Sequence, residues 1–184
     1  MHNNLTNGAT SNLVYHEKQV KELCALHSLN NLMQKPNAFT KYEMDCLCQK
    51  ITPGKVWNPH CSLLGLGNYD INVIMLALQN KGYECVWFDK RKNIDELDLS
   101  SILGFILNTP SNMMLGNFSL PLKRRHWVCL RRIGSNFYNL DSKLISPENL
   151  GDSEIVFKNY LKEQLTCKDK ILLIIPCCPA HSLL

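Results

Sequence analysis

The chain has 184 residues, of which 45% are hydrophobic and 20% are charged, and its formal net charge is +4. This length supports one domain around one apolar core, and the composition excludes disordered and collagen-like proteins. The longest nearly unbroken apolar stretch, Ile171 to Ala180, is too short to span a bilayer and contains two prolines, so we expect no transmembrane segment. Because the positive charge is small and dispersed, we expect no nucleic-acid partner.

The cysteine content is the unusual feature of the composition, because nine cysteines cannot all pair. The first twenty residues contain no apolar stretch that resembles a secretory signal. We therefore expect a reducing, cytoplasmic environment, with the nucleus as a second location. Reduced thiols leave three interpretations, which are core packing, metal ligation, or one reactive nucleophile among inert neighbours.

Helices are predicted mainly in the first half of the chain. Residues 1–13 are polar and have no period that could bury a face, so we expect a flexible tail. Apolar spacing, N-cap residues, and proline or glycine stops predict three helices, which run from Cys24 to about Gln34, from Thr40 to about Lys50, and from the cap Asp70 to Gly82. Residues 52–69 are predicted as loop.

Strands are predicted mainly in the second half, together with one helix from about Ser153 to Leu165. A turn at Gly134 to Asn136 joins two of the strands as a hairpin. The predicted strands are Tyr83 to Phe88, Ile102 to Leu107, Trp127 to Arg131, Phe137 to Leu140 and Ile171 to Ile175. Helices followed by antiparallel strands indicate an α+β fold rather than alternating β-α-β units.

Cys24 differs from the other cysteines because it lies in the first turn of a predicted helix. The positive end of a helix and its unpaired backbone N–H groups favour the thiolate form of a cysteine. A cysteine near a helix start is nevertheless more often a small buried residue. A nucleophile also needs a base and a group that orients the base.

His126 is the best candidate for that base, although a lone histidine here would more often be an ordinary edge-strand residue. It opens one strand of the predicted hairpin, and Asp141 ends the other. Hairpin geometry places these two ends side by side, so the carboxylate could hydrogen-bond the imidazole. His27 is one helical turn from Cys24 and points along the helix surface, so we interpret it as structural or as a supporting residue.

Several separated blocks, in the correct order, resemble the Josephin domain family. One block, Gly67 to Ile74, is similar specifically to the small Josephin-domain-containing proteins. The remaining blocks are Tyr15 to Gln19, Leu23 to Leu32, His126-Trp127 and Phe137 to Ser142. The resemblance covers about Val14 to Pro176, so we expect residues 14–176 to be the catalytic domain and residues 177–184 to be a short tail.

The resemblance implies a papain-like cysteine protease fold, with N-terminal helices packed against an antiparallel sheet. It also implies deubiquitinase activity, which cleaves the peptide or isopeptide bond after the C-terminal glycine of ubiquitin. The partners would be ubiquitin and ubiquitinated proteins, the protein would be a monomer, and no cofactor would be needed. By position, Cys24 is the nucleophile, His126 the general base and acid, Asp141 the residue that orients His126, and Gln19 an oxyanion-hole donor.

The third catalytic position and the ubiquitin-contacting surface differ from parts of the family. This chain has Asp141 where the ataxin branch has Asn, and a carboxylate should favour imidazolium beside thiolate more strongly than an amide does. Ile71 matches a family position that contacts ubiquitin, with core packing as an equally weighted alternative. Asn72 and Lys81 replace other residues of that ubiquitin-contacting surface.

Three other patterns have simpler interpretations. Gly65-Leu66-Gly67-Asn68 lacks the Lys-Ser/Thr of a phosphate loop and is interpreted as a turn that leads to Asp70. Lys123-Arg124-Arg125 is typical of a solvated face, and we expect it to point away from a groove that accepts the basic tail of ubiquitin. Clusters of cysteine and histidine lack zinc-site spacing, so we expect free thiols and no metal at Cys46/Cys48, His60/Cys61 and Cys177/Cys178 with His181.

Two other classes of function stay open. One is a non-catalytic module that binds ubiquitin and has kept the fold. The other is a papain-like thiol enzyme that acts on a different modifier or works as a transferase. The presence of Cys24, His126, Asp141 and Gln19 together argues against the first of these.

Overall fold

The structure is a computed structural model that describes residues 13–20, 22–54, 60, 67–115, 118–167 and 169–177. All but Leu13 of the predicted tail at residues 1–13 and all but Cys177 of the predicted tail at residues 177–184 lie outside these ranges, as do Gly65 and Leu66 of the predicted turn. The helices are α1 (Cys24–Met33), α2 (Lys41–Ile51), α3 (Ile71–Asn80) and α4 (Glu154–Thr166), with two short 3-10 helices, η1 (Ile94–Glu96) and η2 (Leu99–Ser101). No helix within the described ranges has the length and apolar character needed to cross a bilayer.

Two helices begin at the predicted cap residues Thr40 and Asp70, and a third begins after Ser153, the predicted start of that helix. Thr40 accepts from the backbone N–H of Glu43, whose carboxylate accepts in return from the backbone N–H of Thr40, so the capping box before α2 is complete. Asp70 caps α3 by accepting from two backbone N–H groups, and Ser153 caps α4 by accepting from one. The predictions of these helix starts are confirmed.

All strands in the described part of the chain belong to one sheet, in which every neighbouring pair is antiparallel. The order is β1-β6-β2-β3-β4-β5, so the last strand in the sequence lies between β1 and β2. The strands are β1 (Val86–Trp87), β2 (Ile102–Leu115), β3 (Phe118–Ile133), β4 (Asn136–Asn139), β5 (Glu148–Gly151) and β6 (Ile171–Pro176). The predicted α+β order is therefore confirmed.

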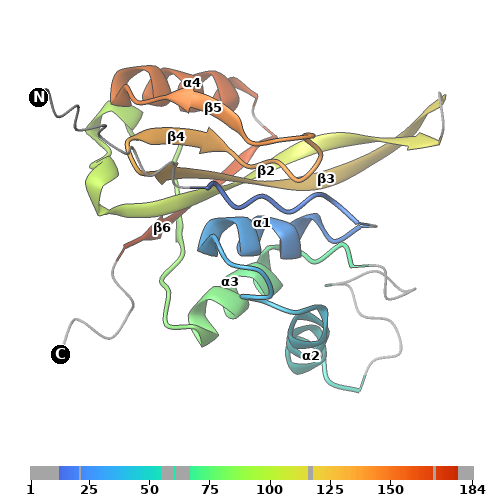
Figure 1. Ribbon diagram of the computed structural model, residues 1–184. Helices are drawn as coiled ribbons and strands as arrows, with labels where there is room; N and C mark the ends of the chain where they lie inside the picture. Colours follow the sequence, from blue (N-terminus) through green and yellow to red (C-terminus); the bar gives the residue numbers. More distant parts are fainter. Residues whose placement is uncertain are drawn as a thin grey trace, which may run out of the picture.

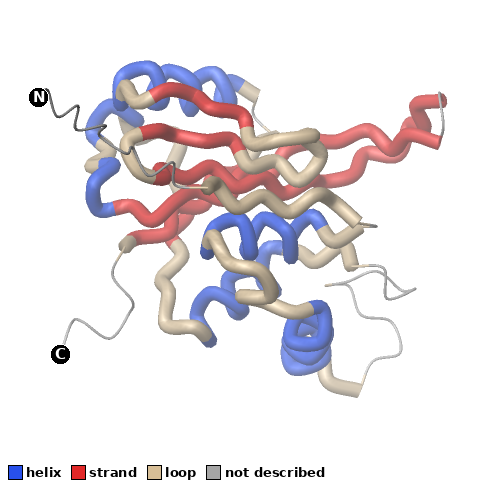
Figure 2. The backbone as a smooth tube through the Cα atoms, viewed as in Figure 1, coloured by secondary structure: helices blue, strands red, loops and turns tan. Residues whose placement is uncertain are grey.

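The sheet is covered on both faces, with α1 to α3 on one side and α4 on the other (Figures 1 and 2). Consecutive residues of the central strands consequently enter different cores. Ile106 and Cys129 pack in the cluster with α1 to α3, whereas Phe105 and Val128 pack in the cluster with α4. Two buried faces explain why these strands are continuous apolar runs instead of alternating polar and apolar residues.

The structure differs from the sequence prediction at four strands. β1 is shorter than predicted, β5 was not predicted because Glu148–Gly151 carries no apolar alternation, and β2 and β3 extend beyond the rest of the sheet as a two-stranded ribbon (Figure 1). Pro110 lies in this ribbon, past Asn108, the last β2 residue that pairs with β6. A proline is tolerated there because one edge of β2 is no longer hydrogen-bonded.

Candidate active site

Cys24 is the first residue of α1, and its side chain is buried, with 5% exposed surface. The N-cap of α1 is Leu23, which makes no side-chain cap hydrogen bond. The sequence thus supplies polar caps to α2, α3 and α4 but an apolar residue before Cys24. The first N–H groups of α1 therefore have no side-chain acceptor from the cap position, and they favour negative charge near this sulfur.

His126 lies in β3, and its buried ring contacts Asp141 directly. The Nε2–H of His126 donates to Oδ1 of Asp141 over 2.6 Å. Asp141 is held by the turn that follows β4, in which its Oδ1 also accepts from the backbone N–H of Lys143 at 2.9 Å. The backbone N–H of Leu144 donates to the carbonyl oxygen of Asp141 and closes this turn. The carboxylate therefore has little freedom to leave the imidazole.

The charges of this site stabilise one another. Burial of the His126 ring disfavours its protonation, but hydrogen bonds with Asp141 and Cys24, and the negative charges of both groups, raise the pKa of His126 above its ordinary value. Burial of Asp141 has the opposite effect on a carboxyl, yet its bonds to His126 and to the Lys143 backbone N–H lower the pKa of Asp141. Since Nε2 is used by Asp141, Nδ1 is the ring nitrogen that remains for Cys24.

Gln19 lies in the segment of residues 13–20, which passes between α1 and the turn after β4 (Figure 1). Its backbone N–H donates to the carbonyl oxygen of Ser142 at 2.7 Å. At the other end of the segment, Tyr15 and Gln34 exchange two hydrogen bonds between backbone and side-chain amide groups. The segment is thus fastened on both sides, which fixes the position of Gln19 relative to α1.

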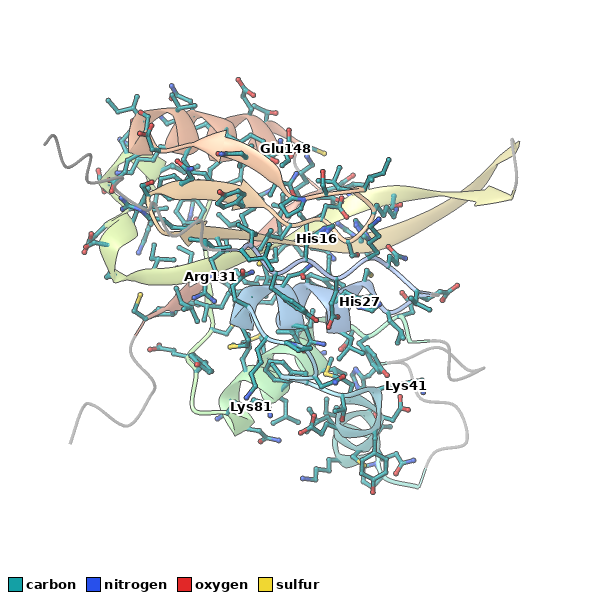
Figure 3. The ribbon with its side chains drawn as sticks, viewed as in Figure 1. His16, His27, Lys41, Lys81, Arg131 and Glu148 are labelled. Carbon is teal, nitrogen blue, oxygen red and sulfur yellow. The ribbon has the colours of Figure 1, made fainter. Side chains whose placement is uncertain are left out.

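His27 also holds the segment of residues 13–20 in place, in agreement with its interpretation as a structural or supporting residue. Its Nδ1–H donates to Glu17 Oε2 at 2.7 Å, and its Nε2 accepts from the backbone N–H of Val20 at 3.2 Å. The Glu17 carboxylate also accepts from Asn30 and from the Tyr15 hydroxyl. Burial alone would raise the pKa of Glu17, but the hydrogen bonds from these side chains lower it. In Figure 3, His27 lies on α1, below the segment that carries His16.

Two residues at this site have contacts that the sequence did not predict. His16 Nε2–H donates to the carbonyl oxygen of Asp141 at 2.9 Å. Asn31 donates from its side chain to the carbonyl oxygen of Leu140 at 2.9 Å and accepts from the backbone N–H of Glu17 at 2.6 Å. Both residues belong to the blocks that resemble the Josephin family, but no spacing rule links either residue to a strand end so distant in the sequence.

The segment before α3 contacts the chain directly before Cys24. Gly67 forms an isolated parallel bridge with Glu22, and the backbone N–H of Asn68 donates to the carbonyl oxygen of Glu22 at 2.8 Å. Ile71 opens α3 and is half-buried against the cluster that contains Cys24. Core packing of part of this side chain is therefore confirmed, and its contact with ubiquitin stays a prediction.

Arg125 is the one residue of the basic run whose side chain the structure describes. Arg125 is exposed, and its guanidinium donates to the carbonyl oxygen of Asp169, close to β6. The side chains of Lys123 and Arg124 lie outside the described residues, as do Cys61, Cys178 and His181. Within the ranges that the structure describes, no three His, Cys, Asp or Glu side chains are grouped as metal ligands.

Comparisons with known proteins agree with the resemblance. The Josephin family matches residues 19–175. A Josephin-like protein of Drosophila melanogaster is 49% identical over 163 residues, which cover 88% of this chain and 73% of that protein. Josephin-2 of Homo sapiens is 53% identical over 141 residues, with 77% and 74% coverage. Ataxin-3 of Homo sapiens is 27% identical over 161 residues, with 76% and 40% coverage. The family match and the helix-covered antiparallel sheet establish the predicted papain-like α+β fold.

Proposed function

Because this chain belongs to the Josephin family, we propose that it is a cysteine-dependent deubiquitinase that hydrolyses the bond after the C-terminal glycine of ubiquitin. The observation that carries the proposal is the group at the start of α1, in which the buried Cys24 and His126 lie with the half-buried Asp141. A thiol, an imidazole and a carboxylate in this order supply a nucleophile, a base and a group that orients the base. Metal and cofactor have no role in this proposal.

The reaction proceeds by acyl transfer. His126 accepts the thiol proton of Cys24, and the thiolate attacks the carbonyl carbon of the terminal glycine. The oxyanion that forms is stabilised by the side-chain amide of Gln19 and the backbone N–H of Cys24, and one such donor typically contributes about 3 to 4 kcal/mol. His126 then protonates the leaving amine, and a thioester with Cys24 remains. A water molecule deprotonated by His126 hydrolyses the thioester and releases ubiquitin as the free acid.

A ubiquitin whose C-terminus carries an electrophile tests the proposal. We expect covalent labelling of Cys24, found by intact mass and peptide mapping, and complete loss of labelling in Cys24→Ala. Cys167→Ser is the matched control, because Cys167 is an exposed thiol that the proposal does not use. We expect that variant to react like the wild type. Labelling that persists in Cys24→Ala would show that the nucleophile is assigned wrongly.

The same reagent separates the other two classes of function. A non-catalytic module would bind ubiquitin without forming an adduct. A papain-like enzyme for another modifier would react with a probe built on that modifier and leave the ubiquitin probe unreacted. Cys24→Ala should retain binding of unmodified ubiquitin, measured by calorimetry, because the alanine removes only the reacting sulfur. The proposal fails if the wild type gives no adduct with the ubiquitin probe.

A further inference from the structure

A surface pocket of about 490 Å³ adjoins the proposed catalytic group. It lies between the segment that carries Gln19 and the turn that follows Asp141, and the Gln19–Ser142 backbone hydrogen bond joins these two walls. The lining residues are Lys18, Gln19, Ser142, Lys143, Leu144 and Ile145. Neither the acyl-transfer steps above nor the family comparison gives this pocket a ligand.

The chemistry of the proposed reaction decides which part of the substrate lies here. His126 must deliver a proton to the leaving amine, so the amine side of the cleaved bond has to lie beside His126. The pocket wall starts at Ser142, directly after the Asp141 that holds His126. The chain directly before Cys24 is bridged instead to Gly67, which leads to Ile71, the position expected to contact ubiquitin, so we assign the tail of ubiquitin to that side.

Two lysine side chains line this pocket and give it positive charge. Lys18 and Lys143 are both exposed, and within the described residues neither forms an ion pair with a carboxylate. Lys143 Nζ donates to the hydroxyl of Ser111 at 2.7 Å, and that neutral partner does not offset its charge. Asp141 attracts Lys143, but its Oδ1 is already held by the His126 ring and the backbone N–H of Lys143.

These charges favour one occupant over another. The C-terminal tail of ubiquitin is basic and would be repelled by Lys18 and Lys143, whereas an acidic segment would be attracted. Ile145, with 85% of its surface exposed, adds an apolar contact at the pocket edge. We propose that this pocket binds the segment of the ubiquitinated protein that carries the modified lysine, and that Lys18 and Lys143 select acidic residues beside that lysine. This inference rests on the proposed deubiquitinase function.

Paired isopeptide substrates test the inference. Ubiquitin is joined to the Nε of a lysine within a short peptide, and the neighbouring residues are either aspartate and glutamate or lysine and arginine. We expect kcat/KM at low salt to be about 3- to 10-fold higher for the acidic peptide, since each exposed charge pair contributes modestly. The preference should decline as salt is added, because exposed charges are screened. The double variant Lys18→Glu/Lys143→Glu should lose the preference or reverse it.

The controls separate this inference from the function on which it rests. Lys92→Glu changes the net charge at an exposed lysine outside the pocket. The ratio of its kcat/KM for the acidic peptide to its kcat/KM for the basic peptide should equal that of the wild type. Ubiquitin with a small fluorogenic amide measures hydrolysis without a peptide on the leaving side. If the wild type cleaves this amide through Cys24 but shows no acidic preference, or if the preference survives the double variant, the inference is wrong. If the wild type does not cleave the amide, the proposed function is wrong.

Discussion

The contact between His126 and Asp141 couples the stability of the site to pH. The pKa of His126 is raised in the folded chain, so its contribution is complete below the unfolded value of about 6.5 and is lost as pH rises through the folded value. The pKa of Asp141 is lowered, so its contribution is present above about pH 3.9 and is lost as pH falls through the folded value. The pair therefore stabilises the fold most between about pH 4 and 6.5.

Asp141→Asn should lower hydrolysis without unfolding the protein. A neutral amide supports imidazolium less than a carboxylate does, and we expect kcat to fall on the order of tenfold, the effect of weakening one charge-assisted hydrogen bond by about 1.4 kcal/mol. The free energy of unfolding, measured by urea titration, should differ from wild type most between about pH 4 and 6.5. Asp152→Asn, at an exposed carboxylate, is the control. Unchanged turnover in Asp141→Asn would remove the role assigned to this residue.

The sequence predicted the pairing of His126 with Asp141 from hairpin geometry, but in the structure Asp141 does not lie in the strand paired with β3. The β3–β4 ladder pairs Leu130 with Asn139 and ends there, so Asp141 reaches the imidazole from the turn that follows. The contacts of His16 and Asn31 were not predictable, because each joins the N-terminal half to the chain after β4. Such contacts depend on the packing of α1 against the sheet, which no local pattern specifies.

At the level of elements, local chemistry predicted the helices better than the strands. Thr40, Asp70 and Ser153 each satisfy backbone N–H groups of the helix they precede, so these starts are encoded within a few residues. Strand ends depend instead on neighbours from distant parts of the chain. β2 continues through Pro110 because β3 pairs with it there, and β5 exists because β4 offers an edge to a polar segment.

The loop segment that leads into α3 requires glycine at position 67. The φ of Gly67 is +107°, and a Cβ atom would lie 2.7 Å from the carbonyl oxygen of Glu22. We expect Gly67→Ala to destabilise the fold by about 3 kcal/mol, the sum of backbone strain and overpacking. Activity should fall as well, because Glu22 lies just before Cys24.

Gly54→Ala is the matched control for this glycine. Its φ is also positive, at +75°, but a Cβ atom there would meet nothing within 4 Å. We expect a cost of about 1 kcal/mol from strain alone and no effect on hydrolysis. Urea unfolding and ubiquitin-amide cleavage measure both variants. Equal losses of stability in the two variants would show that contact with Glu22 is unimportant.

At the level of the whole molecule, the sheet separates two cores, and the candidate active site belongs to one of them. Cys24 packs in the cluster with α1 to α3, whereas Phe157 of α4 packs in the cluster on the opposite face. Phe157 is fully buried and stacks on Phe137 with ring centroids 4.2 Å apart. The stability of the fold and the chemistry of the site can therefore be changed separately.

Phe157→Ala should destabilise the protein by about 3 to 5 kcal/mol, because it leaves a large cavity between α4 and the sheet. The rate of Cys24 labelling per folded molecule should stay close to that of the wild type. Ile155→Ala, on the same helix with 73% of its side chain exposed, should change the free energy of unfolding by less than about 0.5 kcal/mol. A loss of labelling in folded Phe157→Ala would show that the two cores are coupled.

The place of β6 between β1 and β2 determines when the fold can be completed during synthesis. β6 comes last in the sequence, yet both β1 and β2 hydrogen-bond to it. A growing chain that already contains Cys24, His126 and Asp141 still lacks the strand that joins β1 to the rest of the sheet. Residues of both cores come from β6, so neither core is complete before it is translated. We therefore expect the proposed hydrolysis of conjugates to begin only after β6 has been translated.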